Sequence, residues 1–239
     1  SGDDELARRA EGAIYYVSTT GHDTNNGSMA SPWQTVQKAA NVMIAGDTAI
    51  VQSGRYSETV STMRAGARLA PITFRGSPGA SLARFKINHD YINVERFSFT
   101  GCRSLYAGSI QIGGSNVRVV GNTISNTTND VYGIITLTSN GAIPSPYPTN
   151  VYIGGNTLRG VFGHNICIYL DHSLVESNNI SDTFMDAFRV WGHDTTLRAN
   201  TISNLYVFTG NHPDVIQTFG AAGYAYNIVF ENNAAFNSY

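Results

Sequence analysis

Two aspartates and a histidine occupy matching positions before short, similar segments, and an arginine lies within one of these segments. These four residues are well suited to acid–base chemistry. The segments read SIQIG (109–113), GIITL (133–137), NICIY (165–169), AFRVW (187–191) and VIQTF (215–219). His164, Asp186 and Asp214 each directly precede one segment, and Arg189 lies inside the fourth. If the segments stack as neighbouring strands, about 4.8 Å apart, the two carboxylates lie roughly 5 Å from each other.

Two carboxylates at that separation allow three interpretations. They can be the acid and the nucleophile of a retaining glycosidase, which needs roughly this distance. They can bind Ca²⁺, a hard cation that collects carboxylate oxygens. One of them can instead pair with Arg189 in a structural salt bridge of little functional meaning. The sequence leaves all three open.

An asparagine that returns in one local frame predicts the fold that would stack these segments. The frames VRVVGNTI (117–124), VYIGGNTL (151–158), SLVESNNI (173–180), TTLRANTI (195–202) and IVFENNAA (228–235) contain Asn122, Asn156, Asn178, Asn200 and Asn233. Repeats of about 22 residues, made of short alternating strands without a helix, predict an all-β parallel β-helix of about six to eight coils. The longer repeats are then coils with loop insertions. We expect the asparagines to be structural, each bonded to its counterpart on the next coil.

Alternation along the second strand of each coil divides its side chains between core and exterior. The set predicted to fill the core is Ile110, Ile112, Ile134, Thr136, Ile166, Ile168, Phe188, Val190, Ile216 and Thr218. The outward columns are Gln111, Ile135, Cys167, Arg189 and Gln217, then Gly113, Leu137, Tyr169, Trp191 and Phe219, and finally Tyr132, His164, Asp186 and Asp214. A slip of one residue in this register would exchange the two sets.

The outward aromatic run of Tyr169, Trp191 and Phe219 favours carbohydrate binding, because aromatic faces can stack on sugar rings along the solenoid. Gln217 and His212 would line the same strip. Insertions at 139–150 and 205–213 flank this strand and would make it a cleft. The alternative is that these loops fold over the strip and bury the aromatics.

Local turn chemistry accounts for several other polar groups. Pro213 fixes the backbone before Asp214, which can direct its carboxylate or simply form a turn. The pairs Asp171-His172 and His193-Asp194 lie between strands, and we interpret them as turn residues.

The first part of the chain predicts a cap. Residues 1–12 are interpreted as a disordered lead or tag, 13–60 as a strand, a capping helix and the first coil, and 61–239 as the β-helix. The helix is predicted from Ser31 as N-cap and Pro32 to about Met43, with Val36, Ala39, Ala40 and Met43 on its apolar face. The chain ends inside a repeat frame, so we expect a partner copy or a further segment to cover the last coil.

The segments YYVSTTGHDTNNGSMASPWQTVQKAANVMIAGDTAIVQSGRYSETV (15–60), APITFRGSPGA (70–80) and YINVERFSFTG (91–101) carry a family resemblance. They resemble bacterial proteins of the pectate-lyase-like right-handed parallel β-helix superfamily, especially extracellular carbohydrate-active members similar to family 9 pectate lyases. The resemblance implies a right-handed β-helix, a secreted or cell-surface location and a polysaccharide substrate. For a uronate lyase it also implies Ca²⁺ to neutralise the substrate carboxylate and a lysine or arginine as base. Arg189 is the arginine that the predicted register directs into the cleft, and Lys86 lies on an earlier coil.

Composition excludes other classes of function. The net charge is −2 and the lysines are Lys38 and Lys86, which gives no electrostatic basis for nucleic-acid binding. No apolar run of about 18 residues predicts a membrane span. Cys102 and Cys167 are interpreted as isolated thiols. We therefore expect a lyase acting on a pectate- or alginate-like polymer. The alternatives are a glycoside hydrolase using Asp186 and Asp214, and a non-catalytic glycan-binding or surface β-helix.

Overall fold

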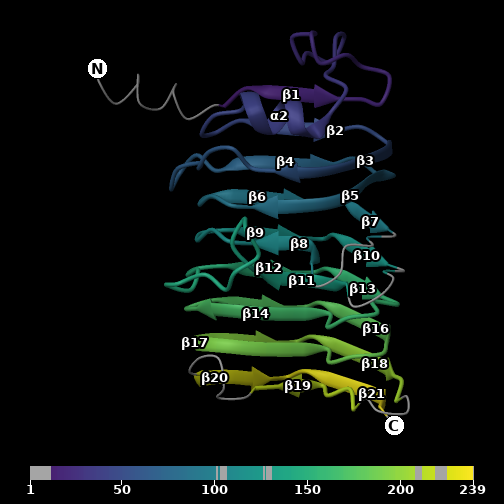
Figure 1. Cartoon of the computed structure of the whole chain (residues 1–239), viewed down its shortest axis with the longest axis vertical. Helices are drawn as coiled ribbons and strands as arrows, with labels where there is room; N and C mark the ends of the chain where they lie inside the picture. The colour runs from purple at the N-terminus through teal and green to yellow at the C-terminus, as the bar shows by residue number, and fades with distance from the viewer. Residues whose placement is uncertain are drawn as a thin grey trace.

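The protein, in this computed structural model, is a right-handed parallel β-helix whose coils stack along one axis (Figure 1). The structure describes residues 12–100, 102, 107–125, 127, 131–207, 212–218 and 225–238. Neighbouring coils pair through parallel strands, and the chain descends from one coil to the next without returning. The predicted fold class is confirmed.

Three columns of strands, here called faces A, B and C, form the walls of the solenoid. Face A contains β1 (Ile14–Val17), β2 (Thr48–Val51), β4 (Ile72–Gly76), β6 (Ile92–Glu95), β9 (Arg118–Val120), β12 (Tyr152–Gly154), β15 (Leu174–Glu176), the second half of β17 (Phe188–Arg198) and β20 (Ala225–Glu231). Face B contains the first halves of β3 (Gly54–Ser61) and β5 (Ala80–Ile87), then β7 (Ser98–Thr100), β10 (Thr123–Ser125), β13 (Thr157–Arg159), β16 (Asn179–Thr183), β18 (Thr201–Leu205) and β21 (Ala234–Ser238). Face C contains the second halves of β3 and β5, then β8 (Gly108–Ile112), β11 (Tyr132–Thr136), β14 (Ile166–Asp171), the first half of β17 and β19 (Ile216–Gln217).

The corners between faces use left-handed backbone at intervals of five residues. In three successive coils these residues are His172, Ser177 and Asp182, then Asp194, Ala199 and Asn204, then Asn227, Asn232 and Asn237, all with φ between 48° and 56°. Asparagine, aspartate and glycine tolerate this conformation better than most residues. The high asparagine content of the chain therefore has a conformational cause.

The recurring asparagines form a continuous buried ladder, as predicted. The backbone N–H and the Nδ2 of Asn156 both donate to Oδ1 of Asn178, at 3.0 and 2.9 Å, and Nδ2 also donates to the carbonyl of Val119 at 2.9 Å. The same pattern links Asn122 to Asn156, Asn178 to Asn200 and Asn200 to Asn233. Asn122, Asn156, Asn178 and Asn200 are each 1% exposed, so the ladder satisfies backbone groups that water does not reach.

The inward alternation predicted for face C is confirmed through β17, and in the last strand Ile216 still packs against the core. Ile110, Ile134, Ile166 and Phe188 are fully buried and belong to one hydrophobic core. Ile216 is only half-buried and Thr218 is exposed. Among the described residues β19 pairs with β17 alone.

The N-terminal cap is a short helix, α2 (Val36–Val42), which lies against the first coils (Figure 1). Its predicted apolar face is buried. The predicted start at Pro32 is wrong: Trp33 pairs with the first strand, its N–H donating to the Tyr16 carbonyl at 3.0 Å. Thr35 is the N-cap, and its hydroxyl accepts from the Lys38 N–H at 3.1 Å. Within the part of the chain that the structure describes, no helix has the length and apolar character of a membrane span.

Replacing Asn178 by alanine should destabilise the fold. The change removes the acceptor of two Asn156 donors and leaves buried polar groups unpaired, so we expect a loss of at least about 2 kcal/mol in the free energy of unfolding. Urea unfolding measures it, with Asn140→Ala in an exposed loop as control. Equal stabilities of the two variants would contradict the role of the ladder.

Candidate active site

The register predicted for the outward side of face C is confirmed. Cys167 pairs with Arg189, and Arg189 pairs with Gln217. The backbone N–H of Asn165 donates to the Asp186 carbonyl at 3.0 Å, and that of Ala187 to the Asp214 carbonyl at 2.9 Å. His164, Asp186 and Asp214 therefore follow one another on successive coils, as the sequence predicted.

The middle of the outward side is covered, which corrects the expectation of an open aromatic platform. Trp191 is 2% and Tyr169 9% exposed, and their rings stack on each other with centroids 4.4 Å apart. Tyr147, from the insertion after β11, packs against Tyr169 at 5.8 Å. Together with Ile135 and Cys167 these rings form a second hydrophobic cluster outside the main core. The insertion thus buries the aromatics, and Phe219 lies outside the described residues.

Burial also sets the protonation of two groups in this cluster. It raises the pKa of the Cys167 thiol to about 12 and that of the Tyr169 hydroxyl to about 12. Cys167 therefore stays a neutral thiol near pH 7 and is not a nucleophile.

Asp186 is a buried carboxylate whose two oxygens are both engaged. Oδ1 accepts from the Asp214 N–H at 2.9 Å. Oδ2 lies 3.1 Å from Arg189 Nε and 3.1 Å from His164 Nδ1. Burial by itself would raise the pKa of Asp186, but the contact with His164, the Asp214 amide and the Arg189 charge together lower that pKa below its ordinary value. Asp186 is therefore a charged positioning group.

The contact with Arg189 shows which ring nitrogen of His164 accepts a hydrogen bond. Arg189 Nη1 lies 2.8 Å from His164 Nε2, and a guanidinium can only donate, so Nε2 is the acceptor. We assign the proton of His164 to Nδ1, next to Asp186. The Tyr132 ring stacks on the imidazole at 5.4 Å. His164 Nδ1 lies near Asp186 without forming a hydrogen bond, and Nε2 contacts Arg189, so His164 holds Arg189 in place.

Asp214 is the accessible carboxylate of the pair, with 44% of its side chain exposed. Its Oδ2 accepts from Gln217 Nε2 at 3.2 Å, and Gln217 Oε1 accepts from Arg189 Nε at 2.8 Å. His212 is exposed and lies 3.8 Å from Asp214. The structure thus brings the predicted catalytic residues together in one network.

The donor set around Asp186 does not fit two of the interpretations. A calcium ion between Asp186 and Asp214 would have to displace N–H donors and lie beside the Arg189 guanidinium, which repels it. A glycosidase pair needs two carboxyls that reach the substrate, and Asp186 has no free oxygen. The structure agrees with the third interpretation, because Asp186 forms a salt bridge with Arg189.

A second cationic site lies on the same side of the solenoid, and the sequence argument did not assign it. Arg84 and Lys86 project outward from β5 on either side of the buried Phe85. Arg84 Nη2 donates to Gln111 Oε1 at 2.7 Å, while the buried Nε has no hydrogen-bond partner. No ion pair between described residues involves either cation. Burial, and then the Arg84 charge, lower the pKa of Lys86.

Lys86 lies in the same outward column as Arg189, four coils away. Successive pairings, each one coil apart, lead from Lys86 through Gln111, Ile135 and Cys167 to Arg189. That separation is roughly 19 Å at the usual strand spacing. The two cationic sites are therefore distinct. The alternation of Arg84 and Lys86 with buried Phe85 is the signal that could have found the pair in the sequence.

Comparison with known proteins assigns no family to this chain. No protein-family model matches it. It is similar to the uncharacterized protein YwoF of Bacillus subtilis (strain 168), with 38% identity over 64 residues, which is 27% of this chain and 14% of that protein. The match is too short to assign a family.

Solved structures share the fold over nearly the whole chain. A GH136 lacto-N-biosidase from Eubacterium ramulus superposes with a TM-score of 0.62 and 11% identity, covering 98% of this chain and 57% of that one. A rhamnogalacturonan lyase gives 0.56 and 13%, covering 95% and 74%. XylC in complex with xylose gives 0.52 and 13%, covering 93% and 66%. The likeness shows the fold alone, and the chain spans little more than half of the lacto-N-biosidase.

The network around Asp186 should make the free energy of unfolding depend on pH in the acidic range. The carboxyl has a lowered pKa in the folded protein, so its contribution is complete above its unfolded value of about 3.9 and is lost as pH falls through the lower folded value. We expect the stability difference between wild type and Asp186→Asn to be largest near neutral pH and to shrink towards about pH 3. Urea unfolding across this range measures it. A difference that stays constant would contradict the charged state of Asp186.

Proposed function

We propose that the chain is the β-helix of an extracellular carbohydrate-active enzyme that cleaves a uronate-containing polysaccharide by β-elimination. The observation that carries this proposal is the pair Arg84 and Lys86, two half-buried cations without a carboxylate partner among the described residues. Unneutralised cations in a partly desolvated site favour a bound anion. The carboxylate of a uronate sugar is an anion of this kind.

The chemistry assigns one role to each cation. β-Elimination removes the proton at C5 of a uronate and breaks the glycosidic bond at C4, and it needs the adjacent carboxylate neutralised. The positive charge of the half-buried Arg84 guanidinium would neutralise this carboxylate. Lys86 would take the C5 proton, which requires its amine to be neutral, and the lowered pKa favours that form. The leaving sugar oxygen takes a proton from water or from the lysine.

Calcium is not required by this assignment, since Arg84 supplies the positive charge that a cation would otherwise give. The fold is compatible with β-elimination but does not distinguish it from glycoside hydrolysis. It is shared with a rhamnogalacturonan lyase and equally with a lacto-N-biosidase. Glycoside hydrolysis is less well supported because Asp186 is saturated with donors. A purely glycan-binding role needs neither a base nor a lowered lysine pKa.

Substitution of Lys86 tests the proposal directly. Wild type, Lys86→Ala and Lys86→Arg would be assayed on pectate, alginate and neutral glycans, with and without chelator, recording unsaturated-product absorbance and reducing ends in parallel. We expect absorbance on an acidic polymer that falls by about 10²-fold or more in Lys86→Ala, the usual contribution of a general base. The matched control is Lys38→Ala, on the cap helix, which should keep full activity. Reducing ends without absorbance, or no turnover, would contradict the proposal.

The pH profile gives a second prediction. If Lys86 is the base, the rate rises with pH as the ammonium loses its proton, with a midpoint below the ordinary lysine value of about 10.4. The initial rate measured between about pH 6 and pH 10 gives this limb. A rate that falls with pH over the same range would assign the base elsewhere.

A further inference from the structure

The corner between faces C and A carries a column of left-handed residues, half of which are asparagines. The column is Tyr91, Asn116, Asn150, His172, Asp194 and Asn227, each with φ between 48° and 58°. Asn150 Nδ2 donates to Asn116 Oδ1 at 2.8 Å, so asparagine alone is sufficient to form this corner. On two successive coils a histidine and an aspartate replace it, and a second histidine, His193, directly precedes the aspartate.

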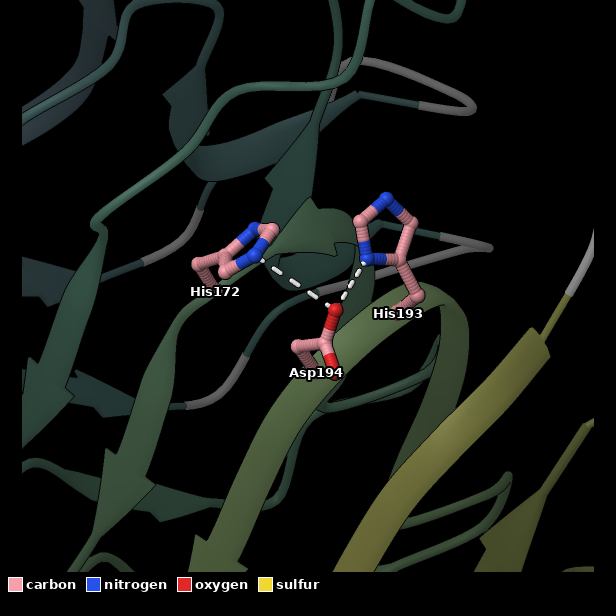
Figure 2. A group of neighbouring side chains, drawn as sticks. All are labelled: His172, His193 and Asp194. Carbon is pink, nitrogen blue, oxygen red and sulfur yellow. Dashed lines mark hydrogen bonds and ion pairs between the residues drawn. The ribbon is translucent and has the colours of Figure 1, made fainter.

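These three side chains converge on one point (Figure 2). Figure 2 shows the imidazoles of His172 and His193 approaching the same Asp194 oxygen from two sides. Asp194 Oδ2 lies 2.6 Å from His193 Nδ1 and 3.4 Å from His172 Nε2. The three potential ligand atoms lie within 4.8 Å of one another. Small side-chain movements would place them around one ion, with bonds of about 2.0–2.2 Å.

The surrounding groups orient these side chains as an outer shell orients metal ligands. His193 Nε2, on the other side of the ring, lies 3.3 Å from Asp171 Oδ2, the arrangement of a carboxylate–histidine–metal triad. The Tyr226 ring stacks on His193 at 4.7 Å and 12°. Asn227 Nδ2 donates to Asp194 Oδ1, which leaves Oδ2 directed towards the histidines. A turn that only had to close the backbone would need none of these contacts.

We propose that His172, His193 and Asp194 bind a divalent transition metal ion of the zinc type. His172 Nε2, His193 Nδ1 and Asp194 Oδ2 are the three protein ligands. Two imidazole nitrogens favour zinc over calcium or magnesium, which prefer oxygen ligands. Metal binding replaces the proton that His193 Nδ1 shares with Asp194. This proposal does not depend on the polysaccharide lyase activity or on Arg84 and Lys86.

Three protein ligands leave a fourth position for a water molecule or another oxygen ligand. A pocket of about 340 Å³ adjoins the cluster and is lined by Ser145, Pro146, Tyr147, Asp171, His193 and Tyr226. Small oxygen ligands can therefore approach the ion from this side.

The test uses the full chain and metal chlorides alone. Calorimetric titration with Zn²⁺ should show one ion bound per chain, and Co²⁺ should give the visible absorption of a four-coordinate site. We expect His172→Ala and Asp194→Asn each to weaken Zn²⁺ binding by at least about tenfold, and Asp171→Asn, in the outer shell, by about tenfold. Ca²⁺ at the same concentration should not compete. Zn²⁺ should also raise the melting temperature of wild type but not of His172→Ala.

His172→Ala is the decisive variant because 63% of this side chain is exposed, so its loss does not threaten the fold. The matched control is His22→Ala, an exposed histidine remote in sequence whose removal should leave the affinity unchanged. Absence of Zn²⁺ binding to the wild type would overturn the proposal. So would binding that survives both His172→Ala and Asp194→Asn.

Discussion

A ladder of five asparagines, one on each of five successive coils, holds this part of the solenoid in register, and the positions of the side chains on these coils depend on it. Each Oδ1 after that of Asn122 accepts two hydrogen bonds from the asparagine on the coil before it, and each Nδ2 before that of Asn233 donates both to the next asparagine and to a backbone carbonyl. An asparagine shifted by one residue would lose all of these bonds in a site without water. Burial therefore makes the ladder selective for a single alignment of coils.

This alignment explains why the order of residues on face C could be predicted and why their exposure could not. Cys167 and Arg189 follow Asn156 and Asn178 at the same distance along the chain, so once the ladder is recognised the columns follow. Whether a column meets solvent is decided by the insertions, which have no periodicity. Tyr147 carries no signal in the sequence that it packs on Tyr169, and that contact closes the aromatic strip. The start of α2 was missed for a similar reason, since the pairing of Trp33 with the first strand overrides the local signal at Pro32.

The two cationic sites on face C differ in how their charge is balanced. Arg189 faces Asp186 at 3.1 Å and is tied to Gln217 and His164, so its charge is already matched within the protein. Among the described residues Arg84 donates a hydrogen bond to the neutral Gln111 and forms no ion pair. Burial, and then the charge of Arg84, lower the pKa of Lys86. A half-buried cation without a counter-ion is costly unless a ligand supplies the anion. Because of this contrast, we favour Arg84 and Lys86, on an earlier coil, as the candidate catalytic residues over Asp186 and Asp214, the pair predicted from the sequence.

The corner of His172 and Asp194 illustrates how a β-helix can gain a site without altering its frame. A corner residue has only to accept left-handed backbone, at a cost of roughly 1–2 kcal/mol for residues other than glycine and less for asparagine or aspartate. Its side chain is otherwise unconstrained, whereas the inward and ladder positions are fixed by burial. Because the coils between Asn156 and Asn200 contain no long insertion, residues 22 apart in sequence become neighbours, which brings His172 beside Asp194 and Asp171 beside His193. The repeat length alone would have shown this convergence in the sequence, where turn chemistry was the simpler interpretation of each pair taken separately.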